Sequence, residues 1–464
     1  MPVLLQPQRL VRAPLDAMGA MGVTDAPRAA TPRTFHVWTI GCQMNVAESD
    51  AIAVALRQRG LTHVPSMDNA ELVVLNSCTV RESAEQRVQG TLGNLAHRKQ
   101  ENPDLMVALT GCSVEPDLDA MGQKLPMVDF FFHPGALDHF LAQLEAHEVV
   151  AAPGESFEAN PLRGYSSPVS TYVSVMQGCN KFCTYCIVPY RRGREVSRPI
   201  ADVVADVRMM TRRGAKEITL LGQIIDHYGR DLAPRSHLAD LMEAVNEVEG
   251  LERLRFMTSH PRDMDDRLIE AIAQLPKAVE TVHLPVQAGD DVVLRRMRRQ
   301  YTVERYRALI EKIRASIPGV AVTTDIIVGF CGETEEQFQH TLDLMDAVQF
   351  DVVHAACYSP RHGTVSASWD DDVPQEEKEE RRRRLEHRQE ETQTRLNARL
   401  LDTVQDILVE DSQSHRQDLP QWRGRTRTNK LVFIPRGDEN LIGQTVPVRI
   451  TKTSPWALQG VMRS

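Results

Sequence analysis

Short apolar runs alternate with longer amphipathic runs along most of this 464-residue chain, and this alternation constrains the fold more than any other feature. Apolar, β-branched runs bounded by turn residues are typical of strands, and the amphipathic segments between them are typical of helices that cover a parallel sheet. The alternation occurs in two series, at 35–147 and 171–358, with a stretch rich in Pro, Gly, Ser and Glu between them. The sequence therefore predicts an α/β protein built on parallel sheets.

The chain divides into five segments by composition and periodicity. Residues 1–33 mix Pro, Ala, Arg and Met without a period, and we expect them to form a mobile extension. Residues 34–150 are expected to form an N-terminal parallel α/β domain, and residues 151–168 a linker. Residues 169–400 contain six strand-like runs, which predicts a partial TIM-like (β/α)6 barrel because eight units normally need about 250 residues. Residues 401–464 have short strand-like runs punctuated by Gly and Pro, as in a small antiparallel β-barrel.

Composition excludes several classes of protein. Eight cysteines in 464 residues are far fewer than in a disulfide scaffold, where they exceed about 8% of a short chain. No apolar run approaches the ~18 residues of a membrane span, and the N-terminus lacks the apolar core of a signal peptide. We therefore expect a cytoplasmic protein without membrane association, in which cysteines at special spacings bind metal or act in catalysis.

Charge is distributed unevenly along the chain. The 54 Lys and Arg against 63 Asp and Glu give a net charge of -9, which argues against a wholly basic nucleic-acid-binding protein. From Gln421 onward, however, eight basic residues stand against two acidic ones, which points to a polyanionic partner for the C-terminal domain. The run Arg381–Arg384 lies in a charged helical pattern with Glu residues at i,i+4, so we interpret it as a solvated helix face.

Cys179, Cys183 and Cys186 form a C-x3-C-x2-C array just after the first strand-like run of the second series. Three thiolates within eight residues can hold one compact metal centre, and soft sulfur ligands select iron–sulfur clusters or zinc. A structural zinc site needs four ligands, usually from two C-x2-C pairs, whereas only three occur here. Three cysteines on a four-iron cluster leave one iron open to a small molecule, at the end of the barrel where active sites form.

Cys42, Cys78 and Cys112 each close a strand-like run of the first series, at intervals of 36 and 34 residues. Each interval matches one strand–helix–strand repeat. Equivalent ends of parallel strands lie along one edge of a sheet, where ligands bind, so we expect the three thiolates to converge on a second cluster with an open iron. Cys331 and Cys357 fit neither set and are interpreted as packing residues.

The C-x3-C-x2-C array resembles the signature of the radical S-adenosylmethionine (SAM) superfamily. The resemblance implies a [4Fe-4S] cluster whose open iron binds SAM, and reductive cleavage of SAM to a 5′-deoxyadenosyl radical. It also implies a SAM pocket near the end of the second barrel strand and near a later glycine motif that begins at Ile327. The residues expected to contact SAM are Gly222, Gln223, Gly329 and Glu333.

Longer motifs resemble the methylthiotransferases within this superfamily, over about 35–464. These motifs are Gly41–Asn45, Asn76–Arg81, Gly111-Cys112, Gly178–Tyr190, Gly193–Glu195, Ser197–Pro199, Thr258–Pro261, His283–Gln287 and Thr324–Phe330. The resemblance implies that the dispersed cysteine set binds an auxiliary [4Fe-4S] cluster, which holds or supplies sulfur. It also implies that the C-terminal barrel is a TRAM domain, which grips RNA.

Within the family, the motifs are most similar to members that modify N6-isopentenyladenosine at tRNA position 37. Such members replace the hydrogen on carbon 2 with a methylthio group, using one SAM as methyl donor and a second as radical source. The implied partners are the anticodon stem-loop of tRNA, whose bases can be splayed out, and a small electron-transfer protein that serves as reductant. The chain itself is expected to be a monomer. RNA contacts are expected from Arg191, Arg192 and Arg194 beside the cluster loop and from Arg425, Arg427 and Lys430 in the C-terminal domain.

One segment departs from the family pattern, and alternative functions stay open. After Gly222 and Gln223 the family usually continues Asn-x-Asn, whereas this chain has Ile224-Ile225-Asp226, so family contacts are not transferred to these positions. The same chemistry on threonylcarbamoyladenosine in tRNA, or on an aspartate of a ribosomal protein, is one alternative. An RNA-binding iron–sulfur electron carrier is another, but it predicts four protein ligands per cluster rather than two sets of three.

Overall fold

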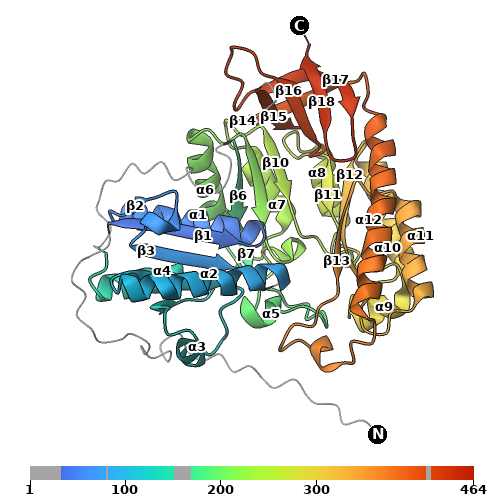
Figure 1. Ribbon diagram of the computed structural model, residues 1–464. Coiled ribbons are helices and arrows are strands. Elements are labelled where there is room, and N and C mark those ends of the chain that lie inside the picture. The colour runs from blue at the N-terminus through green and yellow to red at the C-terminus, as the bar shows by residue number, and fades with distance from the viewer. Residues whose placement is uncertain (1–32, 80–81, 151–168, 414–419, 464) are drawn as a thin grey trace.

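The computed structural model describes residues 33–79, 82–150, 169–413 and 420–463. The expected mobile extension, apart from its last residue, and the expected linker at 151–168 lie outside these described residues. Figure 1 shows an N-terminal α/β unit beside a central α/β unit, with a C-terminal barrel at the opposite end of the central unit from the short helix α5 (Val188–Arg191).

The N-terminal unit is a five-stranded parallel sheet with helices on both faces, in agreement with the predicted parallel α/β domain. Its elements are β1 (Thr34–Ile40), α1 (Gln43–Gln58), β2 (Thr62–His63), β3 (Leu72–Ser77), α2 (Glu82–Glu101), β4 (Met106–Gly111), α3 (Leu118–Lys124), β5 (Phe130–Phe131) and α4 (Leu137–Ala146). The strand order is β2-β1-β3-β4-β5. β3 and β4 are buried along their whole length because α1 and α4 cover one face of the sheet and α2 and α3 cover the other. The sequence pattern predicts neither β2 nor α3, because both are too short to show a period.

The central unit contains all six predicted strands. They are β6 (Ser170–Ser174), β9 (Glu217–Leu221), β10 (Arg253–Phe256), β11 (Thr281–His283), β12 (Ala321–Val328) and β13 (Val352–Cys357). The strands form two parallel three-stranded sheets, β10-β9-β6 and β11-β12-β13, which a single bridge between Leu254 and Ala278 connects. The covering helices are α6 (Ile200–Arg212), α7 (Leu238–Asn246), α8 (Asp266–Gln274), α10 (Val303–Ser316) and α11 (Glu335–Val348). One continuous apolar core lies between the strands and these helices.

Shorter elements at the ends of these strands are absent from the sequence-based prediction. They are β7 (Met176–Gln177), β8 (Val196–Ser197) and α9 (Asp291–Arg296). β6 is the edge strand of its sheet, and helix α1 of the N-terminal unit packs against it. The N-terminal unit therefore covers the open edge of the central sheet.

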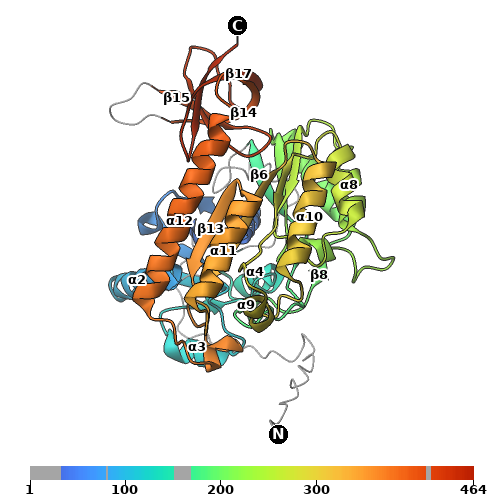
Figure 2. The ribbon, with the colours of Figure 1, turned by 90° about the vertical axis from the view of Figure 1, so that its right-hand side faces the viewer.

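Helix α12 (Gln375–Ala398) connects the central unit to the C-terminal barrel. It packs along β13 and α11 and reaches the barrel strands at its C-terminal end (Figure 2). The interpretation of its arginine run as a solvated face is wrong for Arg381. Only 2% of the Arg381 side chain is exposed, because it pairs with the buried Glu333, whereas 65% of the Arg383 side chain is exposed.

The C-terminal unit is a closed five-stranded barrel with strand order β14-β15-β16-β18-β17. Its strands are β14 (Val404–Gln413), β15 (Gln421–Arg425), β16 (Leu431–Pro435), β17 (Thr445–Thr453) and β18 (Leu458–Met462). The predicted antiparallel barrel needs one correction, because β16 and β18 pair in parallel while the other four pairs are antiparallel. The sequence pattern does not predict strand β15, because Arg423, Gly424 and Arg425 interrupt its apolar alternation.

Candidate metal centres and nucleic-acid interface

The contiguous cysteine set lies on a loop that the antiparallel pair β7 and β8 closes at its base. Gly178 begins this loop with φ +78°, and a Cβ atom there would lie 2.0 Å from the carbonyl oxygen of Arg194, so only glycine fits. The Cys179 N–H donates to the carbonyl oxygen of Gly193 at 3.1 Å, and the Cys186 N–H donates to that of Cys183 at 3.0 Å. The loop thus folds back on itself and gathers its three thiols.

The three thiols of this loop are partly or fully buried and influence one another. Burial, together with the negative charge of the neighbouring Cys183 thiolate, raises the pKa of Cys179 to about 11 and that of Cys186 to about 12. Thiols held close together in a low-dielectric pocket ionise only with a cationic partner or a metal. The arrangement therefore fits a metal centre rather than free cysteines.

A buried arginine supplies positive charge at this site. Arg299 donates from Nη1 to the Cys183 Sγ atom at 3.5 Å and from Nη2 to the Pro285 carbonyl oxygen at 2.8 Å. In the described part of the chain, its guanidinium forms no ion pair with a carboxylate. An isolated buried cation is unfavourable, so an anionic group beside Cys183 would offset it.

The dispersed cysteine set lies at one edge of the N-terminal sheet, as the strand-end spacing predicts. Cys78 directly follows β3 and Cys112 directly follows β4, and Ser77 and Gly111 are paired in register. Cys42 follows β1, which pairs with β3 on its other side. Burial raises the pKa of Cys112, and the Cys42 thiolate raises it further, so the two thiols are within electrostatic reach.

Two asparagines hold the loops that carry this second set. Asn45 accepts the Cys42 N–H at 3.2 Å and donates to the Asn76 side-chain oxygen at 2.8 Å. Asn76 donates back to the Asn45 carbonyl oxygen at 2.8 Å. Both asparagines are fully buried. They belong to the quoted motifs, but the sequence alone does not reveal that they join the first two cysteine loops.

The donor chemistry of both sets fits iron–sulfur clusters with one open iron. Each set offers three thiols, and Cys331 and Cys357 pack in or against the apolar core of the central unit instead. Among the described residues, no group of three His, Cys, Asp or Glu is placed to hold a single metal ion. Each cysteine of a cluster binds a different iron atom, so its sulfurs lie farther apart than those around a single zinc ion.

A buried charge network joins the cluster loop to the loops that follow β9 and β10. Asp263 pairs with Lys181 of the cluster loop, and its carboxylate lies 3.0 Å from His227 Nε2 and 3.2 Å from His260 Nδ1. His227 Nδ1 lies 3.0 Å from the Glu195 carboxylate. Burial lowers the pKa of His227, but Asp263 and Glu195 outweigh it and raise the pKa overall. The network is absent from the predicted site, and only the quoted motifs around Glu195 and His260 hint at it.

Several buried polar atoms at the mouth of the central strands lack hydrogen-bond partners within the described residues. They include the acceptors Gln223 Oε1 and Asp226 Oδ1 and the hydroxyl of Ser259. The second oxygen of Asp226 accepts the backbone N–H of His260 at 2.5 Å. Burial raises the pKa of Asp226 to about 7 and lowers that of His260 to about 4. Buried unpaired acceptors usually face a ligand or water, so this spot fits a polar small molecule.

The four residues expected to contact SAM fall into two groups. Gly222 and Gln223 lie at this mouth, and a Cβ atom on Gly222 would lie 2.6 Å from the Met176 side chain. Gly329 and Glu333 instead pack under helix α12. The Gly329 N–H donates to the Glu333 carboxylate at 2.6 Å, and Arg381 donates to the same carboxylate at 2.9 Å. Glu333 therefore does not fit the role of a SAM ligand, because protein groups already occupy its buried carboxylate.

The three arginines expected to guide RNA beside the cluster loop differ in position. Arg194 is exposed and lies over the Phe182 ring. The Arg191 side chain is 12% exposed and lies 3.5 Å from Glu115. Only 2% of the Arg192 side chain is exposed, and it pairs with Glu48 of helix α1. Arg192 does not fit the predicted RNA contact, because it is enclosed between the N-terminal and central units.

The basic turn of the barrel, which joins β15 to β16 and carries Arg427 and Lys430, docks onto the central unit, although both side chains are expected to contact RNA. Arg427 pairs with Glu280 at 2.8 Å, and Lys430 pairs with Asp351 at 2.9 Å. Arg253, the first residue of β10, donates to the Arg425 carbonyl oxygen at 2.8 Å. Arg427 and Lys430 therefore tie two units together and are not free for RNA. Arg425 is itself 3.4 Å from Glu410.

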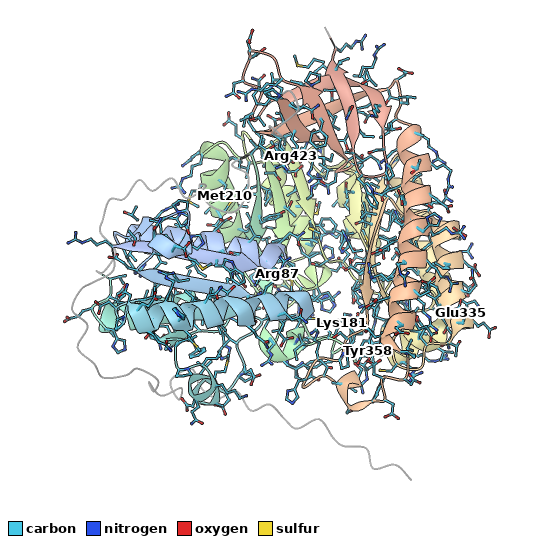
Figure 3. The ribbon with its side chains drawn as sticks, in the orientation of Figure 1. Arg87, Lys181, Met210, Glu335, Tyr358 and Arg423 are labelled. Atoms are coloured by element: carbon cyan, nitrogen blue, oxygen red, sulfur yellow. The ribbon has the colours of Figure 1, made fainter. Side chains whose placement is uncertain are left out.

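The barrel and the cluster loop lie at opposite ends of the central strands. The barrel contacts residues at the amino ends of β10, β11 and β13, whereas the cluster loop follows the carboxyl end of β6. Figure 3 places Lys181 of the cluster loop and Arg423 of the barrel at these two ends. At about 3.3 Å per residue, the eight-residue strand β12 alone spans about 26 Å.

The barrel keeps other basic residues at its surface. Arg449 and Lys452 lie on β17 with exposed side chains, and the exposed Arg463 directly follows β18. Within the described residues, these three exposed side chains form no ion pair. The Trp456 ring between the two strands is 63% exposed. Exposed basic side chains along β17 and β18, with an exposed aromatic residue in the turn between them, suit a nucleic acid.

None of the helices within the described ranges combines the length and the apolar character that crossing a membrane requires.

Comparisons with known proteins place the chain in a family. Three family models match it: "Uncharacterized protein family UPF0004" at 34–133, "Radical SAM superfamily" at 173–345 and "TRAM domain" at 399–462. The tRNA-2-methylthio-N(6)-dimethylallyladenosine synthase of Chloroflexus aurantiacus is 49% identical over 448 residues, which cover 94% of this chain and 93% of the relative. The synthase of the same name from Roseiflexus sp. is 46% identical and covers 94% of this chain and 91% of the relative.

A solved structure supports the fold. The radical SAM methyltransferase TsrM from Kitasatospora setae has a TM-score of 0.52 and 14% identity, and the match covers 70% of this chain and 73% of that chain. At that identity the likeness concerns the fold alone. The full-length relatives and the three matching models are decisive: the chain belongs to the family of the tRNA-2-methylthio-N(6)-dimethylallyladenosine synthases, within the radical SAM superfamily.

Proposed function

We propose that this chain attaches a methylthio group to carbon 2 of N6-dimethylallyladenosine, which is N6-isopentenyladenosine, at position 37 of tRNA. The observation that carries the proposal is the pair of separate three-cysteine sites, one at the end of each parallel-sheet unit. Membership in the radical SAM methylthiotransferases implies SAM and [4Fe-4S] clusters as cofactors. When bound, these cofactors supply the radical and the methylthio group. A radical is needed because a ring C–H is a poor target for an ionic base.

The two cysteine sites are proposed to hold clusters with different roles. The cluster loop, with Cys179, Cys183 and Cys186, is proposed to hold the radical SAM cluster, and Arg299 offsets its charge. The unpaired oxygens of Gln223 and Asp226 are proposed to receive N–H or O–H donors from SAM or the adenosine. The edge of the N-terminal sheet, with Cys42, Cys78 and Cys112, is proposed to hold the auxiliary cluster that carries the sulfur.

The six parallel strands are proposed to work as one partial (β/α)6 barrel, with domain boundaries at 34–150, 169–400 and 401–464. The anticodon stem-loop is proposed to bind the C-terminal barrel and to run along the central unit to the mouth of the strands. A ligand that contacts both the barrel and the mouth of the strands must span about 26 Å along β12, so it must be more extended than a single nucleoside. A monomer suffices, because one chain carries both cysteine sets and the barrel. A small electron-transfer protein is proposed as reductant, in the cytoplasm where tRNA is modified.

Anaerobic reconstitution tests the two-cluster arrangement. We expect about eight irons per wild-type chain, since each site takes a four-iron cluster, and about four in Cys183→Ala or Cys112→Ala. Cys183→Ala should abolish cleavage of SAM to 5′-deoxyadenosine, whereas Cys112→Ala should retain the cleavage and lose methylthiolation. Cys331→Ala is the matched control, and it should keep all eight irons because its thiol packs in the core. Four irons in the wild-type chain would contradict the proposal.

Mass spectrometry of tRNA nucleosides tests the substrate. Cells that lack this protein should lose 2-methylthio-N6-isopentenyladenosine and retain the methylthiolated threonylcarbamoyl nucleoside. The reverse result would show that the enzyme acts on threonylcarbamoyladenosine in tRNA instead. Loss of neither nucleoside would favour a ribosomal-protein substrate, and a chain that never cleaves SAM would favour an electron carrier.

The salt dependence of tRNA binding tests which barrel face contacts RNA. Replacing Arg449, Lys452 and Arg463 by Gln should lower the slope of log K against log salt by about 2–3, because each lost phosphate contact removes about 0.7–0.9. The control replaces Arg427 and Lys430 by Gln, and it should change the slope little because these side chains face Glu280 and Asp351. If the control changes the slope more than the Arg449, Lys452 and Arg463 replacements do, the basic turn rather than this face contacts RNA.

A further inference from the structure

Arg192 connects the two cysteine sites. It caps the C-terminal end of helix α5, six residues after Cys186, so the loop that carries the first cysteine set also delivers this side chain. The guanidinium crosses into the N-terminal unit, where Nε donates to the Cys112 Sγ atom at 3.3 Å. Nη1 and Nη2 both bind the Glu48 carboxylate, the latter at 3.1 Å. Only 2% of the side chain is exposed.

We propose that Arg192 is a positioning residue for the auxiliary cluster, donating an N–H to the Cys112 sulfur and offsetting the negative charge of the cluster. The inference rests on the proposed function, because it needs a cluster on the dispersed cysteines. It assigns to Arg192 a role unlike the RNA contact expected from the sequence.

The geometry favours arginine over any other cation at this position. A planar guanidinium offers five N–H donors in a fixed fork, so two can bind a carboxylate while a third reaches a sulfur. The Lys ammonium is a single point of charge and cannot span both Glu48 and Cys112 in the same way. Glu48 comes from helix α1, which also packs on β6, so the contact fixes the N-terminal unit against the central unit.

Charge and hydrogen bonding at cluster sulfurs set the reduction potential of an iron–sulfur cluster. A cation and an N–H donor stabilise the reduced, more negative cluster, so Arg192 raises the midpoint potential. Glu48 opposes this effect by neutralising the guanidinium. Removing Arg192 and removing Glu48 therefore have effects of opposite sign, which a role confined to joining the two units does not predict.

The chain offers a matched control for a purely structural role. Arg361 of the central unit contacts Glu85 of helix α2 at 3.3 Å, and its side chain is 13% exposed. This pair also joins the two units, yet its carboxylate comes from α2 rather than from α1, which carries Glu48. Arg361→Met therefore removes an ion pair between the units without changing the charge beside Cys112.

The experiment measures the midpoint potential of the auxiliary cluster by EPR-monitored redox potentiometry. The background is the full-length chain with Cys179, Cys183 and Cys186 replaced by Ala, reconstituted with iron and sulfide, so that only the auxiliary cluster is loaded. Iron content and circular dichroism check each variant for loading and folding.

We expect Arg192→Met to shift the midpoint to more negative values and Glu48→Gln to shift it to more positive values. Arg192→Lys, which keeps the charge, should lie between Arg192→Met and the parent, and Arg361→Met should match the parent. If Arg192→Met fails to fold, the Lys and Glu48 variants still decide the sign.

Two results would overturn the inference alone: equal midpoints in the Arg192 and Arg361 variants with iron loaded, or shifts of the same sign in the Arg192 and Glu48 variants. A background chain that loads no iron would overturn the auxiliary cluster itself, and the proposed function with it.

Discussion

Asp226 gives the stability of this protein a pH dependence that the substitution Asp226→Asn should remove. Burial raises the pKa of this carboxyl to about 7 from an ordinary value of 3.8, with Asp263 raising it and His227 lowering it through their charges. The side chain is 2% exposed, so solvent does not screen the effect. Asparagine keeps the acceptor for the His260 N–H and cannot ionise.

The magnitude follows from linkage between protonation and folding. Because the folded-state pKa lies above the unfolded one, the stabilising contribution is fully present below pH 3.8 and is lost as the pH rises to about 7. Between pH 5 and pH 7 the loss spans about two pKa units at about 1.4 kcal/mol each, or about 3 kcal/mol. At pH 7 half of the folded chains still carry this proton, so the loss is complete only by about pH 8 and does not continue above it.

Thermal unfolding of wild type and Asp226→Asn between pH 5 and pH 8 measures this contribution. At about 2–4 °C per kcal/mol for a domain of this size, the Tm difference between the two proteins should grow by about 6–12 °C from pH 5 to pH 8, in favour of the variant. All other titrating groups are shared, so the difference isolates Asp226. Asp370→Asn, which changes an exposed carboxylate in the same unit, should give a constant difference. A constant difference for Asp226→Asn as well would refute the argument.

Two further substitutions test the packing around the sites. Gly178→Ala should displace the cluster loop and lose about four of eight irons, because its Cβ atom would lie 2.0 Å from a backbone carbonyl oxygen. The control Gly193→Ala has a similar positive φ but open space around the Cβ atom, so it should keep all eight irons. Equal iron contents in the two variants would argue against the steric account. Arg381→Met should lower the free energy of unfolding by about 3–5 kcal/mol in urea denaturation, since it leaves Glu333 buried and unpaired. Arg383→Met, on the exposed side of the same helix, should change it by no more than about 0.5 kcal/mol, and similar losses in both would show that burial does not separate them.

The sequence predicts the strands well because their apolar runs are local and long enough to show a pattern. All six strands of the central unit and β1, β3 and β4 of the N-terminal sheet lie where the pattern places them. The two-residue strands β7 and β8 escape because they are too short for periodicity, although they close the cluster loop. β15 escapes because charged residues and Gly424 interrupt its alternation.

The candidate site divides in the same way. The two cysteine sets follow from spacing, since strand ends in a parallel sheet share an edge and C-x3-C-x2-C is contiguous. The network of Asp263, His227 and His260 does not follow, because it joins loops after different strands. Its effect on pKa values depends on burial, which no local pattern records.

The sequence by itself determined the two cysteine triads, the parallel-sheet units and the small C-terminal barrel, since each rests on local spacing or periodicity. Only the tertiary structure decided what the arginines do. Arg192 meets Glu48 across 144 residues, and Arg427 meets Glu280 across 147, so neither partner is visible nearby in the chain. A charge faces solvent or a buried carboxylate according to which distant segments pack around it, and packing is a property of the whole fold.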